Sequence, residues 1–107
     1  MRLLLDENLP KILKQDFPDH IVFTVREMKW NGISNGKLLD LMLNEKFDAL
    51  LTFDKNMEHQ QNFVKYSITV FVLTASINTY SEMKKLTPQI SSILSSSNLI
   101  PGIIVVK

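Results

Sequence analysis

The chain has 107 residues, enough for one domain with one hydrophobic core and too few for two. Its net charge of +1 lacks the basic excess of a tight non-specific nucleic-acid binder, so charge neither demands nor excludes that partner. The absence of cysteine excludes disulfides, thiolate metal sites and cysteine catalysis. No apolar run is long enough for a membrane span or a signal peptide. A single cytoplasmic domain over residues 1–107 with no membrane contact is therefore expected.

Apolar runs alternate with segments of helical spacing along the chain. Short apolar or β-branched runs bounded by polar residues predict strands at 2–5, 20–25, 49–53, 68–73 and 103–106. Apolar residues at helical spacing predict helices at 9–16, 36–46, 57–64 and 81–94. Asn8 is expected to cap the first helix, with Pro10 in its first turn, and Ser34 or Asn35 to cap the second. Pro88 is expected to kink the last helix.

Strands that are apolar on both faces and alternate with helices are typical of a parallel sheet between two helical layers. The sequence therefore predicts a three-layer α/β/α sandwich of about five mostly parallel strands. The first helix is expected to bury Leu9, Ile12 and Leu13. The second, with a wide leucine stripe, is expected to be buried on most of its surface.

Polar side chains follow each strand that leads into a helix. They are Asp6-Glu7-Asn8, Arg26-Glu27, Asp54-Lys55-Asn56 and Thr74-Ala75-Ser76. Parallel strands end at one edge of a sheet, where ligands bind, so Asp6 and Asp54 are expected to meet there. Converging carboxylates repel one another unless a divalent cation or a proton relieves them, and hard oxygen ligands suit Mg²⁺ or Mn²⁺. The alternative is that each Asp merely caps the helix that follows it.

Three segments, Leu3–Pro10, Gly32–Leu39 and Leu50–Met57, resemble the small single-domain PIN-like ribonuclease family. The first matches the family's LLDENLP-type motif in full, and the likeness in element order and length spans nearly the whole chain. The resemblance implies a PIN-like fold and a metal-dependent endoribonuclease site that includes Asp6 and Asp54, with Mg²⁺ or Mn²⁺ as cofactor. It also implies single-stranded RNA as substrate and the toxin half of a toxin–antitoxin pair, with a small DNA-binding antitoxin as partner. A homodimer remains open.

The chain departs from the family pattern in two places. Ser34-Asn35-Gly36-Lys37 replaces an acidic helix start, and Asn56 replaces a second Asp after the third strand. Asn56 can still offer an uncharged oxygen to an ion, and Glu7 and Asp40 are the acids available to replace a missing ligand. The candidate catalytic residues are therefore Asp6, Glu7, Asp40 and Asp54, and the candidate metal ligands are Asp6, Asp54 and Asn56. These losses predict weakened activity and keep open a degenerate domain that only binds a partner protein.

Other residues near the same edge are candidates to contact the substrate. They are Arg26, Lys55 and Asn8. Solvated surface side chains are the alternative for the two cations. Trp30 either stacks on a base or packs its loop against the sheet, and the second interpretation is favoured.

A phospho-receiver domain is the remaining alternative. Such a domain places acids after its first strand, an Asp after the third, a Thr after the fourth and a Lys after the fifth. Here the acids would be Asp6 and Glu7, and the other residues would be Asp54, Thr74 and Lys107. Only twenty residues lead from Asp54 to Thr74, which is tight for a loop, a full helix and a strand. This interpretation is therefore the weaker one.

Overall fold

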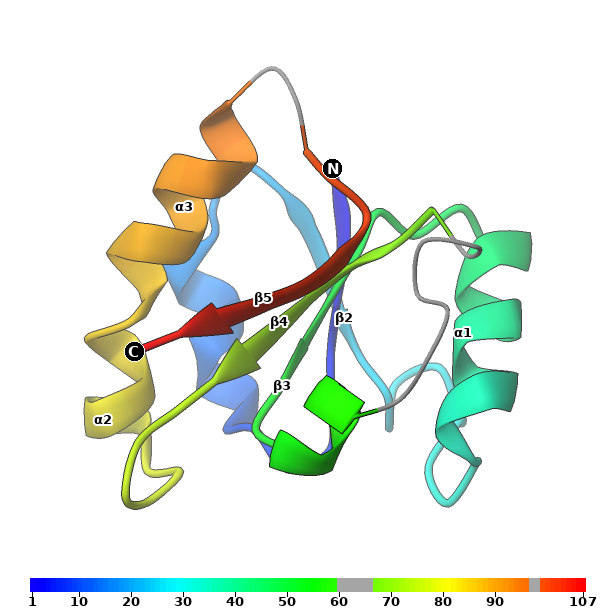
Figure 1. Cartoon of the computed structure of the whole chain (residues 1–107), viewed down its shortest axis with the longest axis horizontal. Coiled ribbons are helices and arrows are strands. Elements are labelled where there is room, and N and C mark those ends of the chain that lie inside the picture. Colours follow the sequence, from blue (N-terminus) through cyan, green and yellow to red (C-terminus); the bar gives the residue numbers. More distant parts are fainter. Residues whose placement is uncertain (60–66, 97–98) are drawn as a thin grey trace.

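The computed structural model describes residues 1–59, 67–96 and 99–107. Five parallel strands form one sheet in the order β2-β1-β3-β4-β5 (Figure 1). The strands are β1 (Arg2–Leu5), β2 (Ile21–Thr24), β3 (Ala49–Thr52), β4 (Thr69–Leu73) and β5 (Gly102–Val106). The predicted parallel sheet is confirmed, and every strand boundary lies within one residue of its expected place.

Alternate residues of each central strand enter separate cores on the two faces of the sheet. Leu3, Leu5 and Leu51 belong to the core on the first face, whereas Leu4 and Leu50 belong to the core on the second face. All five side chains are fully buried. This two-residue period explains why the apolar runs are continuous, since a strand covered on both faces has no side that faces water.

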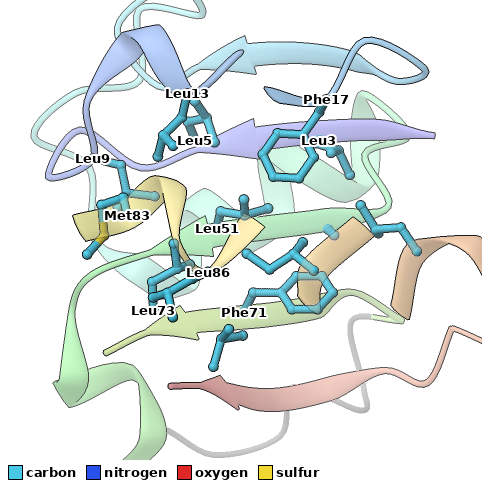
Figure 2. Packing of buried hydrophobic residues seen from close by; sticks show 14 residues of the cluster. Leu3, Leu5, Leu9, Leu13, Phe17, Leu51, Phe71, Leu73, Met83 and Leu86 are labelled. Atoms are coloured by element: carbon cyan, nitrogen blue, oxygen red, sulfur yellow. The ribbon is translucent and has the colours of Figure 1, made fainter. Parts of the chain in front are cut away.

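Helices cover both faces. The 3₁₀ helix η1 (Lys11–Asp16) and the α-helices α2 (Tyr80–Lys84) and α3 (Thr87–Ser95) lie on the first face, and α1 (Asn35–Asn44) lies on the second (Figure 1). Figure 2 shows Leu13 beside Leu5 of β1, Leu9 beside Met83 of α2, and Leu86 next to Leu73 of β4. A further 3₁₀ helix, η2 (Lys55–His59), follows β3.

The first helix differs from the expectation. It is a 3₁₀ helix, and it begins at Lys11 because Pro10 keeps an extended ψ of 131°. The predicted Asn8 cap was wrong, since that side chain accepts a hydrogen bond from the Phe53 backbone instead. Ile12 was also misplaced and is 51% exposed. A helix with three residues per turn rotates Ile12 a third of a turn away from buried Leu13.

The other helices correct three further expectations. Only one stripe of α1 is buried, and Leu43 is 40% exposed, because a single face of this helix meets the sheet. Ser34 occupies the cap position of α1 without a side-chain capping bond. The predicted helix 81–94 is two helices that break after Lys84, with Pro88 in the first turn of α3. Of the predicted helix 57–64, residues 60–64 lie outside the described residues.

The amino end of the sheet carries a cluster of rings around one cation. The Arg2 guanidinium carbon lies 4.7 Å from the Phe47 ring centroid and 5.2 Å from that of Phe23. Trp30 meets Phe47 edge-on, with 5.8 Å between the ring centroids. The expectation that Trp30 packs its loop against the sheet is therefore confirmed. Within the described ranges, no helix has the length and apolar character needed to cross a membrane.

Candidate functional site

The strand order changes direction between β1 and β3. The chain leaves β1 for β2 on one side and returns to β3 on the other, which makes the β1/β3 boundary the topological switch point. Leu5 pairs with Leu51 in register, and the Asp6 N–H donates to the Leu51 carbonyl oxygen at 2.9 Å. Asp6 therefore lies directly beside Thr52 at the carboxyl edge, where Asp54 follows two residues later.

A single hydroxyl group connects these two acids. Thr52 is fully buried, and its Oγ1 donates to Asp6 Oδ2 at 2.7 Å. The same oxygen accepts a hydrogen bond of 3.0 Å from the Asp54 backbone N–H. The expectation that Asp6 and Asp54 lie at adjacent strand ends is confirmed. Thr52 was not among the candidate residues. Its position directly after the apolar run Ala49–Leu51 does indicate a hydroxyl at the carboxyl end of a buried strand.

Asn8 braces the same edge from the next loop. Its Oδ1 accepts a hydrogen bond of 3.1 Å from the Phe53 N–H, and its backbone oxygen accepts one of 2.6 Å from Asn78 Nδ2. These bonds join the loops that follow β1, β3 and β4. The sequence suggested Asn8 as a substrate contact, but its side-chain oxygen is engaged within the protein.

The surroundings of the Asp6 carboxylate disfavour its charged form. Burial raises its pKa above the ordinary 3.8, and the charges of Glu7 and Asp54 add to that rise. Hydrogen bonds from Thr52 and from the Glu7 N–H, which lies 2.9 Å from Oδ1, oppose it. Each carboxylate oxygen thus uses one lone pair and keeps another. A proton or a cation bound there would relieve the unfavourable charge.

Asp54 also has a local role. Its Oδ1 accepts a hydrogen bond of 2.9 Å from the Asn56 N–H at the start of η2. The helix-cap interpretation therefore holds for this residue, but it does not exclude the other, because the cap and the link to Asp6 coexist. Lys55 and Asn56, two further candidates, are exposed on η2.

The remaining acidic candidates are less closely placed. Glu7 is exposed next to Asp6, and Asp40 is exposed on α1. Across residues 1–59, 67–96 and 99–107, no three His, Asp or Glu side chains come together as a metal-binding group. The structure therefore links the Asp6 carboxylate, through Thr52, to the backbone of Asp54, and within the described residues Asp40 does not complete a metal-binding group of three with them.

A small hollow opens beside Asp6, on the side toward β2. Its volume is about 120 Å³, and it is lined by Asp6, Glu7, Leu9, Lys11, Thr24 and Arg26. Arg26 was a predicted substrate contact. Lys11 was not among the candidate residues, since a helix that buries Leu9, Ile12 and Leu13 turns Lys11 outward. Lys55, on η2, does not line the hollow.

Glu27 follows Arg26 and is already paired. Its Oε1 accepts hydrogen bonds from Lys14 Nζ at 2.8 Å and from the Thr24 N–H at 2.9 Å. The bond from Lys14 is the main reason that the pKa of Glu27 is lowered. Glu27 therefore serves to fix the end of β2.

The side chain of Thr74 places a buried hydroxyl at this edge. Thr52 pairs with Val72, so Thr74 lies two residues beyond that register on β4, as Asp54 does on β3. The Thr74 N–H donates to the Val106 oxygen at 2.8 Å, but its buried Oγ1 has no hydrogen-bond partner in the described part of the chain. An unsatisfied buried hydroxyl costs roughly 1–3 kcal/mol.

The donors at this edge fit a hard divalent cation. Asp6 and Asp54 carry carboxylate oxygens of the kind that such a cation prefers, and burial, together with the charges of Glu7 and Asp54, raises the pKa of Asp6. Comparison of the chain with family models, with curated proteins and with solved structures finds no match.

Proposed function

We propose that this protein is a metal-dependent endoribonuclease that cleaves single-stranded RNA, as its resemblance to the PIN-like family implies. The observation that supports it best is the placement of Asp6 and Asp54 at neighbouring strand ends of the topological switch point, where Thr52 bonds the Asp6 carboxylate and the Asp54 backbone N–H. Asp6 and Asp54 would hold Mg²⁺ or Mn²⁺, with the Asn56 side-chain oxygen as a further donor. Such an ion lowers the pKa of a bound water and neutralises charge on a phosphodiester.

The chain's own groups would orient the reactants. Thr52 and the Glu7 N–H fix the Asp6 carboxylate from two sides, so its free lone pairs keep one direction. Lys11 and Arg26 place positive charge beside this carboxylate, where a phosphate group would approach. Glu7 is the nearest further acid to act on a water molecule, and Asp40 would need to reach the site from α1.

The activity should be weak and should prefer Mn²⁺. The two carboxylates of Asp6 and Asp54 hold less charge than the roughly four acids that the family resemblance implies, so cation affinity falls. Mn²⁺ generally binds oxygen and nitrogen ligands more tightly than Mg²⁺ and tolerates less regular geometry. As part of the same proposal, the protein acts in the cytoplasm as the toxin half of a toxin–antitoxin pair. A small DNA-binding antitoxin would be its partner, and a homodimer is compatible with this role.

Cleavage of a labelled single-stranded RNA with Mn²⁺, Mg²⁺ or a chelator tests the proposal. Asp6→Asn should lower the rate by at least about a hundredfold, the loss typical when a group that stabilises transition-state charge is removed. Asn56→Asp should raise it, because it restores a charge beside the ion. Asp19→Asn, an exposed change elsewhere, is the matched control.

Equal cleavage by the parent and by Asp6→Asn would contradict the proposal and would indicate a contaminating nuclease. An inactive parent that gains activity with Asn56→Asp would support the degenerate alternative, a PIN-like domain that binds a partner protein without catalysis.

One observation favours a second candidate function, a phospho-receiver. The order β2-β1-β3-β4-β5 is the flavodoxin-like order that receiver domains also use. In that function Asp54 would accept a phosphoryl group, and Thr74 would respond at the end of β4. Fluorine NMR with beryllofluoride and Mg²⁺ separates the two candidates. A bound signal that disappears in Asp54→Asn would favour the receiver, and its absence would leave the nuclease.

A further inference from the structure

We propose that the hollow beside Asp6 binds a phosphate group through Lys11 and Arg26. Binding of this phosphate and binding of a cation by Asp6 and Asp54 strengthen each other. The ligand of the hollow is a phosphate of the RNA backbone next to the linkage that is cleaved. The identity of this ligand rests on the proposed function, whereas the binding of a phosphate group does not.

The two cations of the hollow are available to a ligand. Lys11 and Arg26 are both exposed, and neither forms an ion pair with an acid of the described ranges, although Asp6 and Glu7 line the same hollow. Glu27, the acid next to Arg26, is paired with Lys14 at 2.8 Å. The hollow therefore keeps two positive side chains whose charge a phosphate could neutralise.

Charge changes sign along the carboxyl edge. Arg26 follows β2, Asp6 follows β1 and Asp54 follows β3, and these three strands are neighbours in the sheet. Parallel neighbours lie about 4.8 Å apart, so the basic and the acidic positions flank Asp6 on opposite sides. An anion on the β2 side and a cation on the β3 side would attract each other across Asp6.

This order predicts coupled binding. Without a cation, Asp6 and Glu7 repel a phosphate that enters the hollow, and the two basic side chains must overcome that repulsion. With a cation held by Asp6 and Asp54, the repulsion is relieved. Each ligand should therefore raise the affinity of the other, because coupling between two binding sites is reciprocal.

The lining also indicates what the hollow does not recognise. Leu9 gives it an apolar wall and Thr24 a hydroxyl, and none of its six described lining residues is aromatic. Trp30, the stacking candidate, packs on Phe47 at the other core. Bases bind single-strand proteins largely by stacking, so this hollow should hold backbone phosphate without selecting a base.

Calorimetry with uridine 5′-monophosphate, with and without Mg²⁺, tests the phosphate site, since this nucleotide has no internucleotide bond to cleave. The double variant Lys11→Gln, Arg26→Gln is compared with the charge-matched double variant Lys37→Gln, Lys107→Gln. The first should weaken binding at least about tenfold, as expected when charge-assisted hydrogen bonds are lost, and the second should not. Mg²⁺ should tighten binding in the parent and in the control.

If nucleotide binding is equally weak in the two double variants, and their melting temperatures are unchanged, the phosphate site is contradicted. A nucleotide affinity in the parent that ignores Mg²⁺ would overturn the coupling.

Binding of a short single-stranded RNA in chelator, measured by anisotropy at several salt concentrations, tests the source of the phosphate. Loss of two phosphate contacts should reduce the slope of log affinity against log salt by about 1.4 in the Lys11→Gln, Arg26→Gln protein. An unchanged slope, with nucleotide binding lost, would overturn the RNA ligand and assign the hollow to free phosphates.

Cleavage measured in parallel separates this inference from the proposed function. If the parent cleaves nothing, and RNA binding is weakened in the Lys11→Gln, Arg26→Gln protein but not in the control variant, the result would support the phosphate site and contradict the nuclease. A nuclease whose binding and cleavage are the same in both double variants would overturn the phosphate site alone.

Discussion

Each end of β1 carries a charged side chain next to three fully buried leucines. The two charged groups have different kinds of partners. At the amino end, the Arg2 guanidinium lies over the rings of Phe23 and Phe47. At the carboxyl end, the Asp6 carboxylate accepts hydrogen bonds from Thr52 and from the backbone of Glu7. Three leucines separate these two residues.

The two charged groups differ in their remaining capacity to bind a proton or a ligand. Arg2 is permanently ionised, its partners are aromatic faces, and its buried Nε has no hydrogen-bond partner among the described residues. Asp6 keeps unused lone pairs, and burial raises its pKa. A buried charge therefore does not by itself mark a functional site. A titratable charge that its surroundings compensate only in part is the better indicator.

The largest expected effect is the response to a cation. Mg²⁺ or Mn²⁺ at a hundredfold excess over its dissociation constant should raise the free energy of unfolding by about 2.7 kcal/mol. Asp54→Asn should abolish this gain and, without a cation, should stabilise the fold by removing repulsion with Asp6. Arg2→Met should retain the gain. Thermal melts measure all three, and a parent protein that ignores millimolar Mg²⁺ and Mn²⁺ would argue against the cation site.

Thr52→Val should destabilise the carboxyl end more than a matched change elsewhere. It removes the donor to Asp6 and leaves the Asp54 N–H without its acceptor, at a cost of about 1–3 kcal/mol. Thr69→Val, also buried, removes only the bond to the Ile100 oxygen and should cost about 1 kcal/mol. Urea unfolding compares the two variants. Equal losses would show that Thr52 contributes no more than an ordinary buried hydroxyl.

Arg2→Met should change the free energy of unfolding by no more than about 2 kcal/mol, because it removes two partly exposed cation–π contacts of about 0.5–1 kcal/mol each. Methionine keeps a long apolar stem between the rings and removes the buried Nε, which has no hydrogen-bond partner in the described part of the chain. Arg2→Ala should cost more, because the stem also packs. If denaturant melts show the Met variant as unstable as the Ala variant, the charge itself stabilises the amino end.

The smallest expected effect is the pH dependence of stability in chelator. Because the folded state raises the pKa of Asp6, the free energy of unfolding should fall as pH rises from about 3.8 through the raised value. Asp6→Asn should remove this fall. Glu27 acts in the opposite sense, since its lowered pKa adds stability above about 4.5 that is lost on acidification. Urea melts across this range should therefore separate Asp6→Asn from Glu27→Gln, and an unaltered fall in Asp6→Asn would contradict the assignment.

The strands were predictable because their signal is local. Each run from Leu3 to Leu5 or from Ala49 to Leu51 is apolar at every position, and a sheet covered on both faces requires that pattern. The placement of Asp6 and Asp54 at adjacent strand ends followed from the same reasoning, since parallel strands end at one edge.

The helix starts and the supporting residues were less predictable because their partners are distant in the sequence. Asn8 reads as a helix cap, but its acceptor oxygen binds the Phe53 N–H, 45 residues away. Thr52 reads as the last residue of a strand, and its importance depends on the register that sets it beside Asp6. Lys11 reads as a solvated lysine until the extended Pro10 delays the helix and the hollow forms beside it.

The bonds made by Asn8 have a consequence for the entropy of binding. Through its side chain and its carbonyl oxygen, three loops from three strands are held in one arrangement before any ligand arrives. Ordering a loop residue costs roughly 1–2 kcal/mol of conformational entropy, and loops that are already ordered do not incur that cost again on binding. The carboxyl edge is thus a preorganised frame, and a cation or a nucleotide bound there would keep most of its interaction energy as affinity.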